Sequence, residues 1–216
     1  MIRLIDKGII QVEPVVIPPR CYLEGRQQDC FSCRLYPDAG CGSPMALCAR
    51  KYPGHNRGCP NYGIKDDCSP NMPLFFEAFD RNYPVFAVYT CFDLKEHVDK
   101  MKALHPNFSD RRSGCVLYWQ AGARKTQREF AGGVLNGFLP EHNGYWLTDS
   151  PEAMGIDVTG TLKQCGITLE WPCMEKTYKI SLLAKLKEDI TEGCKIREKY
   201  AHLRDDGYII FKRKPL

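Results

Sequence analysis

The stretch from Cys21 to Cys68 decides how this chain is organised: CYLEGRQQDCFSCRLYPDAGCGSPMALCARKYPGHNRGCPNYGIKDDC. It holds seven of the twelve cysteines of the 216-residue chain. The residues between the cysteines are rich in Pro, Gly, Asn and Asp, which favour turns. Because the stretch has few apolar side chains to bury, hydrophobic collapse alone would not order it. A cross-link must therefore hold it, and the candidates are disulfides, zinc and an iron–sulfur cluster.

The composition of the whole chain helps to decide which of these cross-links is expected. Its hydrophobic fraction of 44% and charged fraction of 26% are typical of a soluble globular protein. Asp6, Lys7 and Glu13 interrupt the N-terminal apolar residues where a signal peptide would have an unbroken apolar run. These features predict a cytoplasmic protein without a membrane span. In that reducing compartment, a dense cysteine cluster binds metal more often than it forms disulfides.

The cysteine spacing favours an iron–sulfur cluster over a standard zinc module. Only Cys30 and Cys33 are separated by two residues, and a zinc ribbon or finger needs a second such pair. Iron–sulfur ligands commonly come from loops, and the proline of Cys59-Pro60 suits such a loop. We therefore expect a cluster, of the 4Fe-4S type, with zinc as the alternative. The expected metal ligands are Cys30, Cys33, Cys48, Cys59 and Cys68, with Cys21 and Cys41 as alternates or as ligands of a second site.

The other cysteines have no metal-ligand spacing. Cys91, Cys115 and Cys165 occur in apolar strand or helix patterns, where free cysteine packs as a small hydrophobic side chain. Whether Cys173 and Cys194 reach a metal depends on the tertiary fold.

Hydrophobic periodicity predicts an α+β fold with a mixed, partly antiparallel sheet covered by helices, and an N-terminal loop-rich cysteine module organised by metal. The expected organisation is a strand pair at 1–20, a cysteine-rich metal- or cluster-binding module at 21–72, and an α/β domain at 73–216 packed with it as one globular unit. The expected strands are 2–5, 9–17, 83–89, 115–119, 178–183 and 208–211. The expected helices are 74–82, 94–104, 123–138, 151–165 and 185–203.

Two further groups of residues suggest chemistry. Arg124, Lys125 and Arg128 lie in the first turns of the helix expected at 123–138, where they and the backbone amides suggest a site for an anionic ligand. The alternative is an ordinary solvated helix face. Glu141, His142 and Asp149 occur in a loop and would suit acid–base chemistry if the fold placed them together.

The net charge of +4 comes largely from the C-terminal part, which ends in Lys212-Arg213-Lys214. Such a basic segment contacts nucleic acid or an acidic partner, or is simply solvated. No nucleic-acid-binding motif accompanies it, which favours the solvated interpretation.

Two elements resemble an uncharacterised family of small cysteine-rich proteins that are expected to bind metal. Cys59-Pro-Asn-Tyr-Gly-Ile-Lys-Asp-Asp-Cys68-Ser-Pro is similar to the family's Cys-x2-Tyr-Gly-Lys-x3-Cys-Pro-Pro element. Ser150-Pro-Glu-Ala-Met-Gly-Ile-Asp-Val158 looks like its Pro-Ser-Met-Glu-Ala-x-Gly-Ile-Asp-Val element. The resemblance covers about residues 48–184 and implies an iron–sulfur-type metal site. This chain lacks the further cysteines that the family carries before the second element, and the segment from Cys21 to Cys48 looks like an addition.

These observations predict an iron–sulfur protein that transfers electrons or serves as an accessory subunit of a redox or sulfur-transfer enzyme. Its partner would be a protein redox partner or a larger complex. A cluster with only three cysteine ligands would leave one iron open and make the protein itself an enzyme. The alternative from another class is a zinc-stabilised interaction module that contacts nucleic acid or a larger protein complex through the basic C-terminus.

Overall fold

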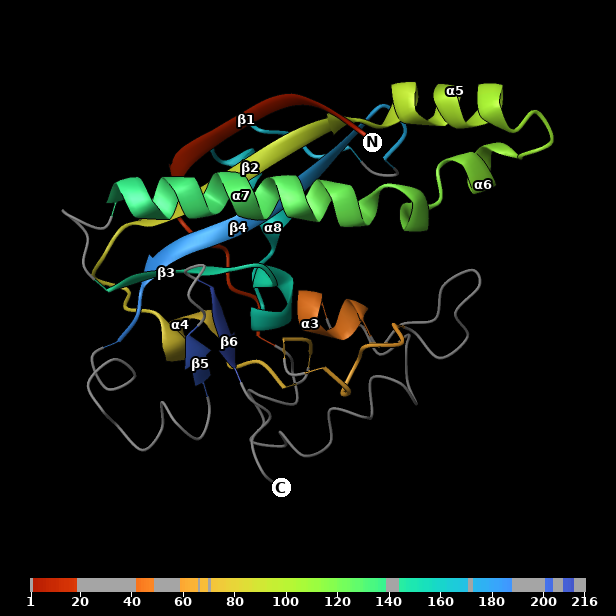
Figure 1. The fold of residues 1–216 in the computed structure, drawn as a ribbon. Coiled ribbons are helices and arrows are strands. Elements are labelled where there is room, and N and C mark those ends of the chain that lie inside the picture. Colours follow the sequence, from red (N-terminus) through yellow and green to blue (C-terminus); the bar gives the residue numbers. More distant parts are fainter. Residues whose placement is uncertain are drawn as a thin grey trace.

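The fold is centred on a four-stranded antiparallel sheet with the strand order β1-β2-β4-β3 (Figure 1). The computed structural model describes residues 2–18, 42–48, 59–65, 67–69, 71–138, 144–170, 173–187, 201–203 and 208–211. The sheet strands are β1 (Arg3–Val12), β2 (Val85–Asp93), β3 (Tyr145–Thr148) and β4 (Lys176–Lys185). The strands β5 (Ala201–Leu203) and β6 (Ile209–Phe211) pair with each other in a second sheet. The α+β class is as the sequence predicts, and the named strands pair only in antiparallel fashion.

Helices lie on both sides of the four-stranded sheet (Figure 1). The helices are α3 (Pro44–Leu47), α4 (Phe75–Ala78), α5 (Leu94–Leu104), α6 (Asp110–Ser113), α7 (Gln120–Phe138) and α8 (Val158–Lys163), with the 3-10 helices η2 (Val116–Tyr118) and η3 (Pro151–Met154). The long helix α7 crosses one face, and η3, α8 and α4 pack at the other. Within the described ranges, no helix combines the length and apolar character that a bilayer span requires.

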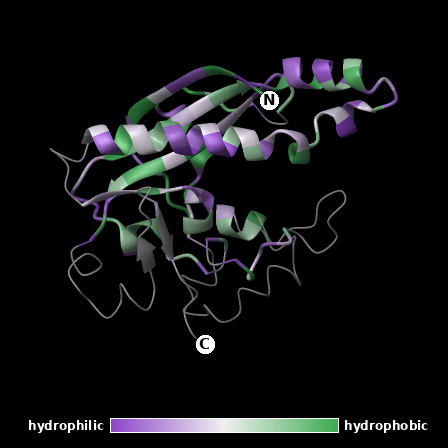
Figure 2. Cartoon of the chain, viewed as in Figure 1, coloured by the Kyte–Doolittle hydropathy of each residue, from purple (hydrophilic) through white to green (hydrophobic). Residues whose placement is uncertain are grey.

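The face of the sheet under α7 is apolar because side chains alternate along each strand. Val88 of β2 and Leu183 of β4 are fully buried there and pack with Ala131 and Leu135 of α7. Figure 2 shows hydrophobic residues along the C-terminal part of β4, and hydrophilic residues mixed with hydrophobic ones around α7. The amphipathic pattern of α7 therefore gives it one face for the sheet and another for solvent.

A buried polar side chain fixes α7 on the sheet. Gln127 Nε2 donates to the carbonyl oxygen of Val88 at 2.8 Å and to Ser181 Oγ at 3.2 Å. Its Oε1 accepts from Thr90 Oγ1 at 2.7 Å. Since a buried amide without partners would cost free energy, these bonds favour one register of α7 against β2 and β4.

The opposite face holds the larger core cluster. Phe75, Phe79, Met154 and Leu162 are fully buried there, against alternate residues of β2 and β4. Phe75 stacks on Phe79, with ring centroids 4.7 Å apart. The apolar residues that predict a helix at 74–82 are therefore core residues, although the helix itself, α4, is a single turn.

Several predicted elements are confirmed. Asp93 ends β2 and caps α5, its Oδ1 accepting a hydrogen bond from the Glu96 amide at 2.8 Å. The helix ends at Leu104, two residues before Pro106. The strands expected at 83–89, 178–183 and 208–211 correspond to β2, β4 and β6, and the helix expected at 123–138 corresponds to α7.

The predicted N-terminal strand pair is wrong, because β1 is one continuous strand. Asp6, Lys7 and Gly8 do not turn the chain but pair with Cys91, Thr90 and Tyr89 of β2, after a register shift between Leu4 and Asp6. The strand lies at the edge of the sheet, where exposed charged residues stay in water and the bulge absorbs the irregularity. The boundaries expected for the cysteine-rich module at 21–72 and for the α/β domain at 73–216 stay a prediction.

The predicted strand at Cys115–Trp119 is also wrong, since this segment contains η2. The Tyr118 amide donates to the Cys115 carbonyl at 3.0 Å, and Leu117 is 84% exposed. An apolar run resembles a buried strand in sequence, but no strand of the sheet pairs with this one. Local turn hydrogen bonds therefore satisfy its backbone.

The helix predicted at 151–165 is divided into η3 and α8. Gly155 ends η3 with a φ of +81°, and a Cβ there would lie 3.0 Å from Leu74 Cδ2. A left-handed conformation and this close approach both favour glycine. Asp157 then starts α8 anew, its Oδ1 accepting from the Gly160 amide at 3.0 Å.

The helix predicted at 185–203 is wrong at both ends. Lys185 belongs to β4 and residues 201–203 form β5, while residues 188–200 lie outside the described part of the chain. Strand β3 was not predicted, because four residues are too few for an alternation of apolar and polar side chains to be recognised.

Replacing Asp157 with alanine is expected to lower the free energy of unfolding by about 0.5–2 kcal/mol, because the first turn of α8 loses its cap. Chemical denaturation measures this change. Asp157→Asn keeps a side-chain oxygen and is the matched control. An equal loss in both variants would show that charge, and not the capping bond, is what Asp157 contributes.

Candidate metal centre

Two short segments of the cysteine-rich stretch are ordered by local backbone hydrogen bonds. Pro44 stands at the start of α3, and Cys48 is the residue that caps its C-terminal end. In the second segment, the Tyr62 amide donates to the Cys59 carbonyl at 3.1 Å, and the Gly63 amide donates to the Ser69 carbonyl at 2.8 Å. Gly63 has a φ of +69°, which glycine adopts without strain. The Tyr-Gly pair of the family-like element thus builds the turn between Cys59 and Cys68.

Cys48, Cys59 and Cys68 come together from these two segments. The Cys59 amide donates to the Cys48 carbonyl oxygen at 2.8 Å. Burial raises the pKa of Cys48 to about 11, and the neighbouring Cys59, Cys68 and Glu152 add to the rise. Burial likewise raises the pKa of Cys68 to about 11, with contributions from Asp67 and Cys59. The three thiols are free of disulfides and close enough to interact electrostatically.

The other expected ligands, Cys21, Cys30, Cys33 and Cys41, lie outside the described residues. Among the residues whose positions are described, no three His, Cys, Asp or Glu side chains are close enough to hold one metal ion. The described part therefore brings three of the seven expected ligands into one region without forming a site from them alone.

Two serine hydroxyls in the same segments are buried without a partner. Ser43 and Ser69 are 0% and 1% exposed, and neither Oγ has a hydrogen-bond partner among the described residues. Ser43 precedes α3, and Ser69 follows Cys68 directly. A buried hydroxyl without a partner costs about 1–3 kcal/mol. The hydroxyls of Ser69, directly after Cys68, and of Ser43, before α3, are thus donors that no described residue uses.

The remaining described cysteines belong to other parts of the fold. Cys91 is 2% exposed in β2, which confirms its predicted packing role. Cys165 packs at the edge of the larger core cluster, and Cys173 packs beside Trp119. Cys115 is half-buried before η2. Cys194 lies outside the described residues.

The three cations of the predicted anion site have different surroundings. Arg128 Nε lies 2.8 Å from Asp149 Oδ2, and Lys125 Nζ lies 3.9 Å from Glu129 Oε1, one turn further along α7. Arg124 makes no ion pair with any described residue. The anion site expected from all three residues is thus reduced to Arg124 as the available cation.

Lys179 is an electrostatic neighbour of Arg124 that no sequence pattern indicates. Lys179 of β4 is half-buried, and its Nζ lies 5.4 Å from the centroid of the Trp119 ring. Burial lowers the pKa of Lys179 and the charge of Arg124 lowers it further, while Glu152, Cys173 and Asp149 oppose the shift. Lys179 occupies an ordinary strand position in the sequence, so no local signal distinguished it.

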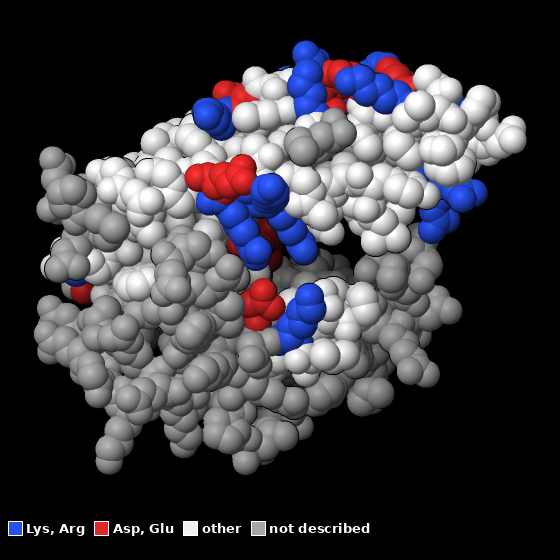
Figure 3. All heavy atoms as spheres, viewed as in Figure 1, with Lys and Arg blue, Asp and Glu red and all other residues white. Residues whose placement is uncertain are grey.

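Glu152 interacts electrostatically with Lys179 and with Cys48. Burial raises the pKa of its carboxyl, and Lys179 acts in the opposite direction. By surface area, the Glu152 residue is exposed to solvent. Figure 3 shows a recess on one face of the molecule, with Lys and Arg side chains above it and an acidic and a basic side chain next to each other below it. Glu152 also adds to the rise in the pKa of Cys48.

The predicted acid–base group is not assembled in the described structure. Asp149 Oδ1 accepts from Ser181 Oγ at 2.7 Å, while Oδ2 pairs with Arg128. Glu141 and His142 lie outside the described residues. Asp149 therefore has a structural role in holding α7 to β4.

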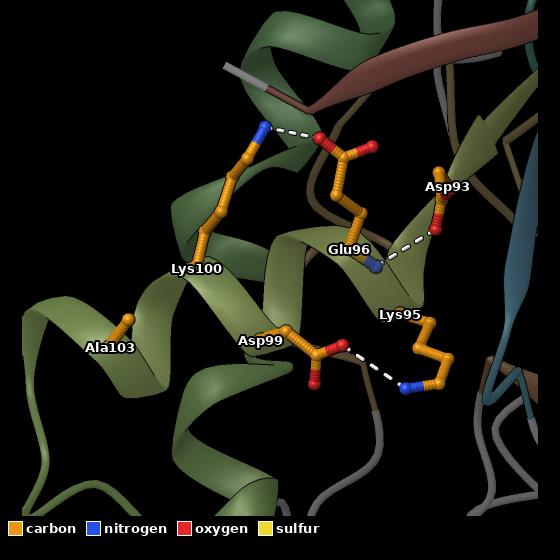
Figure 4. Close-up of a pocket in the computed structure, with 6 residues that line it drawn as sticks. All are labelled: Asp93, Lys95, Glu96, Asp99, Lys100 and Ala103. Carbon is orange, nitrogen blue, oxygen red and sulfur yellow. Dashed lines mark hydrogen bonds and ion pairs between the residues drawn. The ribbon is translucent and has the colours of Figure 1, made fainter.

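A shallow hollow of about 430 Å³ on α5 offers no free charged group (Figure 4). Lys95 pairs with Asp99 and Lys100 with Glu96, while Asp93 caps the helix. The third carboxylate of the lining, that of Asp93, pairs with Arg3 at 2.6 Å, so each charge at the hollow has a partner and we assign no site there.

The family models, the curated proteins and the solved structures contain no match to this chain.

Proposed function

We propose that this protein binds an iron–sulfur cluster and transfers electrons, either directly to a protein partner or as an accessory subunit of a redox or sulfur-transfer enzyme. Cys48, Cys59 and Cys68 would hold the cluster, completed by cysteines of the upstream segment that contains Cys30 and Cys33. The observation that carries the proposal is the convergence of three disulfide-free thiols from two loop segments.

The chemistry of the described residues fits such a group. Thiolates are the ligands of iron–sulfur clusters, and hydrogen bonds to the sulfurs adjust the cluster's potential. The buried hydroxyls of Ser43 and Ser69 have no partner among the described residues and would supply such bonds. Two or more thiolates held close together repel one another, so a cationic centre stabilises them.

A bound cluster would supply one-electron transfer, and the protein's own residues would bind and orient it. If only three cysteines served as ligands, one iron would stay open for Lewis-acid chemistry, which would make the protein an enzyme. A zinc ion held by the same thiols would stabilise the fold without redox chemistry.

Absorption spectroscopy of anaerobically purified protein tests the proposal. We expect a brown protein with a broad absorption band at about 400 nm that dithionite bleaches, as is typical of thiolate-bound clusters. Iron and acid-labile sulfide should be present in similar amounts. The same protein, exposed to air and a chelator, is the control and should lose both the band and the iron.

A colourless protein with stoichiometric zinc would contradict the iron–sulfur proposal and support the zinc alternative. A colourless protein without any metal would overturn both, and would leave the cysteines as free thiols.

A further inference from the structure

Exposed apolar side chains gather at one end of the described structure. Of the eleven large apolar side chains that are exposed among the described residues, four lie within residues 104–118, at the end of α5 and in η2. Leu117 is 84% exposed, the largest value among them, and Leu104 is 72% exposed. Val116 and Tyr118 are 47% and 46% exposed. We call Leu104, Val116, Leu117 and Tyr118 the apolar tip.

Ring contacts hold the two parts of the apolar tip together. The His105 ring stacks on the Phe108 ring with centroids 4.5 Å apart, and the Tyr118 ring stacks on Phe108 at 6.1 Å. Since His105 follows Leu104 directly, these contacts bring the end of α5 to η2. In Figure 1, α5 and α6 extend beyond the sheet at this end of the molecule. The apolar tip is therefore part of a projection from the body of the fold.

The exposure of η2 is fixed by the residue that follows it. Trp119 is buried in a cluster with Phe92 and Leu94, and its Nε1 donates to the Gly114 carbonyl oxygen at 3.2 Å. The chain is thus anchored directly after η2, whose three side chains stay exposed to water. Single exposed apolar side chains are ordinary in proteins, whereas a group of them marks an interaction site.

Two cations without an acidic partner accompany the apolar tip. Arg111 and Arg112 of α6 are exposed and make no ion pair with a described residue, while the neighbouring Asp110 pairs with Lys102. The guanidinium of Arg112 lies 3.9 Å from the centroid of the Phe108 ring, which places it at the stack that holds the tip. The projection therefore combines apolar side chains with a surplus of positive charge, which suits an anionic partner.

An anionic lipid surface matches both properties of this projection. Apolar side chains enter the boundary between headgroups and acyl chains, where tyrosine is also favoured. Guanidinium groups bind two phosphate oxygens of the headgroups at once. A single-stranded nucleic acid would need open aromatic faces for its bases. The Phe108 ring is already stacked, however, and the two most exposed side chains of the tip are leucines, which favours lipid.

We propose that the apolar tip, together with Arg111 and Arg112, docks this protein on the surface of an anionic lipid bilayer. Leu104 and Leu117 enter the apolar boundary of the bilayer, and the two arginines stay at the level of the headgroup phosphates. The docking is peripheral and does not depend on which metal the cysteines hold.

Co-sedimentation of the purified full chain with lipid vesicles tests this docking. One set of vesicles contains phosphatidylcholine and phosphatidylserine in equal parts, and the other contains phosphatidylcholine alone. We expect the wild type to prefer the mixed vesicles, and to bind them less at high salt, which screens the arginines. Leu117→Ser should weaken this binding about tenfold, the effect of one leucine side chain that no longer leaves water. Because Leu117 is exposed, circular dichroism of this variant should match wild type.

Two matched controls separate the apolar tip from general changes of the surface. Ile64→Ser removes an aliphatic side chain that is 73% exposed in the turn between Cys59 and Cys68, and it should leave binding within about twofold of wild type. Arg111→Gln should weaken binding to the mixed vesicles about fivefold, the usual effect of one basic residue at an anionic surface. Lys95→Gln removes the same charge from α5, where Lys95 already pairs with Asp99, and should have an effect of about twofold at most.

Four results would overturn the proposal. Wild type that binds neither kind of vesicle, or binds both equally, does not recognise an anionic lipid surface. Equal binding by wild type and Leu117→Ser would show that the tip is not the docking surface. Equal weakening by Lys95→Gln and Arg111→Gln would show attraction by net charge alone. Self-association that Leu117→Ser abolishes, measured by sedimentation velocity in the absence of lipid binding, would instead make the tip an interface between copies of this chain.

Discussion

If the proposed metal centre exists, alanine at Cys59 or at Cys68 is expected to release its metal, whereas alanine at Cys115 should leave the metal in place. Cys59 and Cys68 lie near each other and near Cys48 in two ordered loop segments. In the proposed centre, removing one thiolate would open the coordination shell and weaken the metal cross-link between the two segments. Iron, sulfide and zinc per chain, together with the absorption band, measure the effect.

Cys115 provides the control, because it is also half-buried but stands before η2, in a different part of the fold. Its replacement should reduce stability slightly and leave the metal content unchanged. If Cys59→Ala and Cys68→Ala both kept their metal, the ligands would have to be other cysteines, and the convergence of these three thiols would have a different explanation.

Alanine at Phe75 is expected to lower the free energy of unfolding by about 3–5 kcal/mol, the usual effect of deleting a buried aromatic ring. Phe75 has no exposed surface. It stacks on Phe79 and meets the edge of Phe76, with ring centroids 4.7 Å and 5.2 Å away. The cavity left by the ring would lie in the larger core cluster, between α4 and the sheet. Chemical denaturation, read by fluorescence or circular dichroism, measures the loss.

Phe76→Ala is the matched control one residue away. Phe76 is only partly buried, and its outer side faces Arg81, whose guanidinium lies 4.7 Å from the ring centroid. We expect it to cost clearly less than Phe75→Ala. Equal losses of unfolding free energy in the two variants would mean that the stacking of Phe75 on Phe79 is not a main source of stability on this side of the sheet.

The proposed metal centre was largely accessible to sequence reasoning, because its chemistry is concentrated in one stretch. Cys59 and Cys68 occur with the turn residues Pro60 and Gly63, and the structure forms the turn between them. The position of Cys48 next to Cys59 was harder to predict from the sequence. A backbone hydrogen bond between segments eleven residues apart brings it to Cys59, and the sequence contains no sign of that pairing.

The electrostatic neighbours of Lys179 could not be found from the sequence. Arg124 was identified as part of an anion site, but together with Lys125 and Arg128, which have acidic partners in the structure. The second cation, Lys179, is in a strand 55 positions later, and Glu152 is in a short 3-10 helix. Each has an unremarkable local pattern. Arg124 of α7 comes near Lys179 of β4 only because the helix packs across the sheet, and the local sequence does not encode that packing.

The sequence by itself determined the elements whose signals are local. Asp93 caps α5 through a bond to a residue three positions away, and the alternation of apolar residues marks β2 and β4. Tertiary structure decided the rest. Segments 2–17 and 115–119 have similar apolar patterns, yet one is a strand because β2 offers it an edge, and the other is a 3-10 turn because no strand pairs with it. Capping and periodicity act within a few residues, whereas strand pairing and the approach of Cys48 to Cys59 require partners that only the folded chain supplies.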